Sequence, residues 1–126
     1  MKKTVFALSL LILLALLSFW NLRHLRTLTG ELCRSVEEAQ HYAQEEEFDR
    51  AEAAVEWALS RWLRSDGYTH IFIRHSEIDA ATDIFYDLRE ALLNEDREGA
   101  ETEAEKLLYH LKSIYTMERI SVKSVF

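Results

Sequence analysis

The sequence contains no proline, only three glycines and a single cysteine among its 126 residues. It therefore has few of the residues that interrupt helices, and it is rich in Ala, Glu, Leu and Arg, which favour them. This composition predicts an all-α fold. The single cysteine, Cys33, excludes an intramolecular disulfide and any zinc site that needs several cysteines.

Basic side chains are scarce beyond the first 29 residues. The other 97 residues carry 11 Lys and Arg against 22 Asp and Glu, which gives them a net charge near −11. Such a surface repels the phosphates of nucleic acids and anionic lipid headgroups, so we expect no nucleic-acid partner. Because 97 residues suffice for only one modest hydrophobic core, we expect a single acidic helical domain at 25–126.

Charge is absent altogether from Thr4 to Leu22, and most of these residues are apolar. As a helix, the nineteen residues extend about 28 Å, which is close to the roughly 30 Å hydrocarbon thickness of a bilayer. Two lysines precede the segment and two arginines follow it. The pattern predicts that residues 4–22 cross the lipid bilayer once, within an N-terminal anchor region at 1–24.

An export signal has a similar pattern, but its cleavage site needs small residues. The end of this segment carries the bulky Phe19 and Trp20, so we expect it to be retained as a signal anchor. Trp20 also suits the interface between lipid and water. The two N-terminal lysines and the terminal amine compete with the two following arginines for the cytoplasmic side. We favour a single-pass protein of the cell membrane with an extracytoplasmic C-terminal domain.

Apolar residues recur at steps of three and four along the rest of the chain, which predicts four amphipathic helices. The first continues the membrane segment and ends near Glu45–Glu47. The second begins with Asp49 as its N-cap, with Glu52 three residues later, and ends at Ser65–Gly67. The third begins near Thr69. The residues expected to face the core are Leu25, Leu28, Leu32, Val36, Ala39, Ala43, Ala51, Val55, Ala58 or Leu59, Trp62, Ile71, His75, Ile78, Phe85, Leu88, Leu92, Ala100, Ala104, Leu107, Leu108, Leu111 and Ile114.

A second acidic turn, Asn94–Asp96, precedes the fourth helix and begins an echo of the first turn at an offset of 49 residues. The echo indicates two related helical hairpins, although chance similarity between amphipathic helices gives the same pattern. We expect an N-terminal transmembrane helix followed by two antiparallel hairpins that form a small four-helix bundle. The tail, Ile120–Phe126, is expected to dock as a short strand or one helical turn. The echoing residues are Glu46, Ala51, Glu52, Glu56 and Leu59 with Glu95, Ala100, Glu101, Glu105 and Leu108.

His75 and Asp79 are the main candidates for chemistry. Four residues apart on a helix, they share a face, where the carboxylate can orient the imidazole for acid–base work or both can bind a metal. His75 also lies on the apolar stripe between Ile71 and Ile78, where a polar side chain needs a partner to be tolerated. We therefore interpret the two as a structural pair, and we assign no catalytic, cofactor-binding or metal-binding residue.

Glu38 and His41 match the Glu-x-x-His element of di-iron four-helix bundles. Such a site needs a second copy, but Leu107 stands three residues before His110. The pair also lies off the apolar stripe of its helix, which indicates a solvated face. Glycine-rich phosphate loops and nucleophile-elbow motifs are absent from the sequence. We expect no enzyme activity, no cofactor and no small-molecule substrate.

Four aromatic residues, Trp57, Trp62, Tyr68 and Phe72, gather around the end of the second helix. They either close the bundle core or form a ligand pocket or partner-binding patch, and we favour the core. Trp62 lies on the apolar stripe and Trp57 lies off it, so Trp57 is expected to be the exposed member.

Several features together resemble an uncharacterised family of short, N-terminally membrane-anchored helical proteins of Gram-positive, clostridial-type bacteria. They are the basic-flanked anchor, the acidic segment Phe48–Glu52, Trp62, the stretch His75–Asp79 and the terminal Ser-x-x-x-x-Phe. The resemblance spans most of the chain. It implies a domain of unknown function behind a membrane anchor, and it implies no reaction.

These observations predict a membrane-anchored helical interaction or scaffold module that binds a protein partner of unknown identity. The alternative is an extracytoplasmic sensor or ligand-binding module that uses His75, Asp79 and the nearby aromatic residues. Metal content and the stability of a His75→Ala variant distinguish the two hypotheses.

Overall fold

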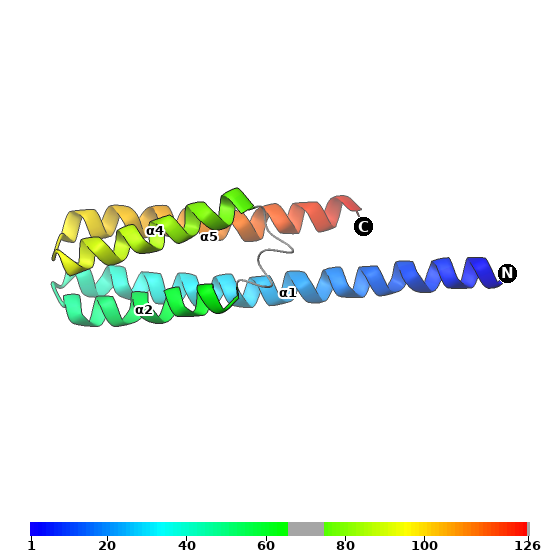
Figure 1. Ribbon diagram of the computed structural model, residues 1–126, viewed down its shortest axis with the longest axis horizontal. Helices are drawn as coiled ribbons and strands as arrows, with labels where there is room; N and C mark the ends of the chain where they lie inside the picture. Colours follow the sequence, from blue (N-terminus) through cyan, green and yellow to red (C-terminus); the bar gives the residue numbers. More distant parts are fainter. Residues whose placement is uncertain (66–74, 126) are drawn as a thin grey trace.

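The computed structural model describes residues 1–65 and 75–125, which form four α-helices and no strand (Figure 1). The helices are α1 (Lys2–Gln44), α2 (Phe48–Arg64), α4 (His75–Leu93) and α5 (Arg97–Val125). Successive helices run in opposite directions, and both hairpin turns lie at the end of the molecule far from the N-terminus (Figure 1). Because α1 also packs against α5, and α2 against α4, the two hairpins close into a four-helix bundle. The predicted fold is confirmed.

The bundle core consists of the predicted apolar stripes. Every residue predicted to face the core is buried, apart from Ile71 and His75, whose side chains lie outside the described residues. Trp62 is the largest aromatic member, and its indole N–H donates to the Thr82 hydroxyl at 2.9 Å, which in turn donates to the Ile78 carbonyl. This satisfied polar group lets a tryptophan lie in the core between α2 and α4.

Helix α1 is continuous from the apolar segment into the bundle and passes through Gly30 without a break. The side chains from Thr4 to Leu14 are exposed, whereas Asn21 is only 4% exposed and marks the start of burial. Among the described residues, α1 is the one helix that is long and apolar enough to cross a membrane, a property that signal sequences share. In Figure 1 its N-terminal part extends well beyond the other helices.

The two hairpin turns have the same backbone geometry and lie 49 residues apart. In each, one glutamate adopts a left-handed conformation: Glu46 has φ 61° and Glu95 has φ 53°. That residue donates its N–H to the carbonyl three residues earlier at 3.1 Å, and the next residue donates to the carbonyl five residues earlier at 2.8 Å. Both turns are therefore Schellman motifs, so the sequence echo extends to backbone structure.

The predicted start of α2 is wrong. Asp49 lies in the first turn, and the N-cap is Glu47, whose side chain makes no capping hydrogen bond. The Schellman motif leaves a single residue between the left-handed Glu46 and the first residue of α2, so the helix begins two residues earlier than expected. Asp49 still places a carboxylate at the positive end of the helix.

Of the two conformations expected for the tail, the short strand is wrong and the single helical turn is too short, because residues 120–125 continue α5. No proline or glycine interrupts the chain after Gly99. The helix therefore continues through the β-branched residues near the end, although their helix propensity is weak. The predicted start of the third helix near Thr69 lies outside the described residues.

A candidate interaction groove between α1 and α2

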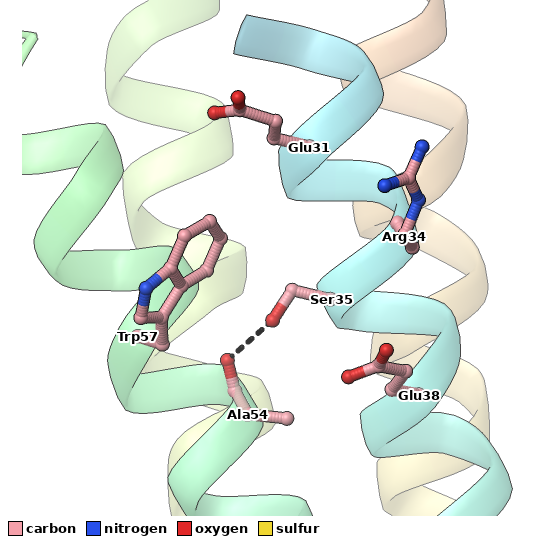
Figure 2. A pocket seen from close by; sticks show the side chains of 6 residues that line it. All are labelled: Glu31, Arg34, Ser35, Glu38, Ala54 and Trp57. Atoms are coloured by element: carbon pink, nitrogen blue, oxygen red, sulfur yellow. Dashed lines mark hydrogen bonds between the residues drawn. The ribbon is translucent and has the colours of Figure 1, made fainter.

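An open groove of about 260 Å³ lies between the two helices of the first hairpin (Figure 2). The Ser35 hydroxyl of α1 donates to the Ala54 carbonyl of α2 at 2.8 Å across it. Because both side chains are small, the backbones approach closely at this point, and the larger side chains border the opening. The groove is lined by Glu31, Arg34, Ser35, Glu38, Ala54 and Trp57.

Trp57 borders the groove from α2, and its side chain is exposed, as predicted from its position off the apolar stripe. In Figure 2 Glu31 and Glu38 extend from α1 on the side of the indole, whereas Arg34 extends away from it. Glu31 also lies 3.4 Å from the Arg61 guanidinium of α2. An exposed aromatic face beside carboxylates is suited to binding a cationic side chain.

Polar contacts between side chains of different helices were not predicted. The His110 Nδ1 of α5 lies 3.7 Å from the Glu77 carboxylate of α4, and both side chains are about one-third exposed. On the other side of α5, the Lys112 amine lies 3.9 Å from the Glu37 carboxylate of α1. The sequence supplies these residue types but not the register between helices, so no motif identifies the pairs.

The predicted pair of His75 and Asp79 is described only in part. Asp79 is exposed on α4, and α4 begins at His75, whose side chain lies outside the described residues. Their pairing stays a prediction, and Asp79 does not line the groove between α1 and α2. Tyr68 and Phe72 also lie outside the described residues.

Glu38 and His41 are both exposed, as expected for a solvated face. The His41 Nε2 lies 3.4 Å from the Glu45 carboxylate, one turn further along α1. Within residues 1–65 and 75–125, no three His, Cys, Asp or Glu side chains converge in a way that could hold a metal ion.

Cys33 is buried in the bundle on α1. Burial raises the pKa of its thiol, while Lys112 lowers that pKa and Glu37 raises it by smaller amounts. A buried thiol with a raised pKa is a poor nucleophile, so Cys33 serves as a small apolar residue of the core.

Comparison with known proteins gives a family but no activity. No curated protein and no solved structure matches the chain. A family match begins in the last turn of the apolar segment and ends with α5, so it covers the whole bundle. The expected membership in a domain of unknown function is confirmed: the chain belongs to the family described as Domain of unknown function (DUF4363), whose model matches residues 19–125.

Proposed function

We propose that this chain is a single-pass membrane protein whose acidic four-helix bundle binds a protein partner, as a scaffold or small subunit of an envelope complex. The unbroken course of α1 from an exposed apolar segment into the bundle core carries this proposal. With Leu22 at the edge of the hydrocarbon, residues 31–38 of the groove lie about 14–24 Å above it along the helix axis. A continuous helix holds the groove at that height without a hinge.

Insertion of the apolar segment into a membrane is supported by its exposure. A dozen large apolar side chains between Val5 and Trp20 are exposed, which is far more apolar surface than water-soluble proteins display. Trp20 is 64% exposed at the expected interface and stacks on His24 at 5.8 Å. The resemblance to clostridial-type anchored proteins points the same way, and we propose that the domain is extracytoplasmic.

The groove favours a Lys- or Arg-bearing segment of the partner. Trp57 supplies a flat aromatic face, and Glu38 supplies a carboxylate on the opposite helix. The domain as a whole is acidic, so a basic partner segment also gains from long-range attraction. The alternative of a ligand-binding module at His75 and Asp79 stays a hypothesis, because the side chain of His75 lies outside the described residues.

Site-specific photocrosslinking in native membranes tests the proposal. A photoreactive residue at position 57 of the full-length chain is expected to give one discrete adduct, which weakens in a Glu38→Gln background. The matched control carries the same photoreactive residue at Tyr86, which is 42% exposed on α4 and is expected to give no such adduct. Absence of any adduct from position 57, together with absence of self-association, would overturn the proposal.

Anchoring and orientation need a separate readout. Carbonate extraction is expected to leave the full-length chain in the membrane, and release of a shortened chain would identify a cleaved signal. For orientation, Cys33→Ala removes the buried thiol and Thr102→Cys places a new one at an exposed position of α5. A membrane-impermeant thiol reagent should label this variant in intact cells, whereas labelling only after lysis would place the domain in the cytoplasm.

A further inference from the structure

The charges of the bundle are divided between its two ends. We call residues 44–52 and 94–101 the distal end, and residues 23–30 and 116–125 the membrane-proximal end. The distal end holds nine Asp and Glu against two Arg, whereas the membrane-proximal end holds four Lys and Arg against one Glu. The net negative charge of the domain therefore does not describe the part that lies next to the bilayer.

The antiparallel register of α1 and α5 brings the four basic residues of the membrane-proximal end together. Gln40 donates to the Glu105 carboxylate at 2.7 Å, and Lys112 pairs with Glu37. About four further turns of each helix toward the membrane, counted from the contact between Gln40 and Glu105, place Arg26 level with Arg119–Lys123. Residues 93 or more positions apart in sequence thus occupy one level of the bundle.

These basic residues also share a face. Arg119 and Lys123 follow Lys112 by seven and eleven residues, so they lie on the side of α5 that borders α1. Arg26 and Arg23 precede Glu37 by eleven and fourteen residues and lie on the matching side of α1. All four are exposed. The one carboxylate at this end, Glu118, lies half-buried on the core-facing stripe that Leu111 and Ile114 continue.

The height of these residues matches the headgroup layer. If the hydrocarbon ends at Leu22, Arg23 and Arg26 lie about 1.5 and 6 Å beyond it along the helix, within a headgroup layer about 5–8 Å thick. A shallow depression of about 430 Å³ above Gly30 is lined by Arg23, Arg26 and Arg34 together with Thr27 and Glu31. Gly30 has no side chain to fill that depression, and nothing lies within 4 Å of where one would begin.

We propose that the membrane-proximal end binds the headgroups of anionic phospholipids, through Arg23 and Arg26 of α1 and Arg119 and Lys123 of α5. Guanidinium and ammonium groups at this height bind lipid phosphates by charge-assisted hydrogen bonds. The proposal rests on the proposed membrane anchoring of α1. It adds that the end of α5, far from the anchor in sequence, is part of the lipid-binding surface.

Lipid selectivity of the full-length chain tests this proposal. The chain is reconstituted in vesicles of phosphatidylcholine that contain spin-labelled phosphatidylglycerol or spin-labelled phosphatidylcholine, and the fraction of label immobilised by the protein is measured. We expect the anionic label to be preferred about fivefold at low salt, and we expect this preference to fall about twofold or more in R119Q/K123Q. These substitutions leave both flanks of the anchor unchanged.

The matched control is R50Q/R97Q, which removes two positive charges from the distal end and should leave lipid selectivity unchanged. Equal losses of lipid preference in both double variants would overturn the proposal, because net charge alone would then explain the effect. An unchanged preference in R119Q/K123Q would also overturn it. Circular dichroism checks that the variants stay helical. Carbonate extraction of the same vesicles separates the two proposals. Release of the chain would contradict the anchoring proposal, whereas an inserted chain without lipid preference would contradict this one.

Discussion

The two ends of the bundle are built by different means. At the distal end, each pair of helices is joined by a Schellman motif whose hydrogen bonds span at most six residues. Toward the membrane-proximal end, α1 and α5 continue a side-by-side pairing that is set by contacts in the middle of the bundle between residues more than sixty positions apart. Local backbone structure thus fixes the distal turns, whereas long-range packing fixes the level at which the basic residues meet. The acidic turns and the basic helix ends therefore depend on different interactions.

The largest expected effect tests whether the two ends belong to one cooperative unit. Phe85 is fully buried, and its ring centroid lies 6.3 Å from that of Trp62. Phe85→Ala should lower the free energy of unfolding by about 3–5 kcal/mol, because it removes a large side chain and leaves a cavity. The measurement is urea denaturation of the full-length chain in detergent micelles, followed by circular dichroism and by tryptophan fluorescence.

The matched control for Phe85→Ala is Tyr86→Ala, at a neighbouring position that is 42% exposed. Its effect should be about 0.5 kcal/mol or less. Coincident transitions by the two probes support one cooperative bundle. Two separate transitions would instead mean that the ends unfold independently.

The next effect concerns the distal turns alone. Glu46→Gly and Glu95→Gly should each stabilise the bundle by about 1 kcal/mol, because a left-handed conformation is unfavourable for a residue with a Cβ and not for glycine. The double variant should gain roughly twice as much, since the sites lie in different turns. Thermal unfolding should show an increase of about 4–8 °C for each.

Glu45→Gly is the matched control for the glycine substitutions. Glu45 is adjacent to Glu46 but has φ −88°, a conformation that needs no glycine. This substitution should be neutral or destabilising. Equal stabilisation by glycine at 45 and 46 would show that the left-handed backbone is not the cause.

A smaller effect should separate the two turns from each other. The Asp96 carboxylate accepts a hydrogen bond from the Gly99 N–H at 3.0 Å and so caps α5, whereas the equivalent Glu47 does not cap α2. Asp96→Ala should cost about 1 kcal/mol and Glu47→Ala only a few tenths, measured by the same thermal unfolding. Equal losses would indicate that both residues act only through their charge at the helix ends.

Much of the fold could be predicted from the sequence because helix faces are local. Within the described residues, a period of three to four residues assigned the core correctly, and it placed Trp62 inside and Trp57 outside. The position of the α2 cap could not be predicted, because it depends on Glu46 adopting a conformation that is rare for glutamate. The full length of α5 was missed because the β-branched residues near its end also suit a strand, whereas the structure continues the helix through them.

The sites were harder to predict than the fold. Trp57 was identified as an exposed aromatic residue, but Ser35 and Ala54 carried no signal, since small residues define a groove only when two helices approach each other. The basic cluster was hidden for a related reason. Net charge averages over both ends, and only the register between α1 and α5 brings Arg119 and Lys123 level with Arg26. Such registers come from packing, which a single sequence pattern does not encode.

The smallest expected effect contrasts a carboxylate of the membrane-proximal end with those of the distal end. Burial raises the pKa of Glu118, so the folded state holds this proton more tightly than the unfolded chain does. The stabilising contribution of the protonated form is complete below the unfolded pKa of roughly 4.3 and is lost as the pH rises through the raised folded value. At pH 7 the ionised Glu118 is therefore mildly unfavourable, and Glu118→Gln should raise the unfolding temperature by about 1–3 °C. This gain should vanish below about pH 4. The control is Glu101→Gln, at an exposed position of the distal end, which should show no such gain at pH 7. A Glu118→Gln gain of the same size at pH 4 and pH 7 would mean that the amide packs better and that the charge of Glu118 is not the cause.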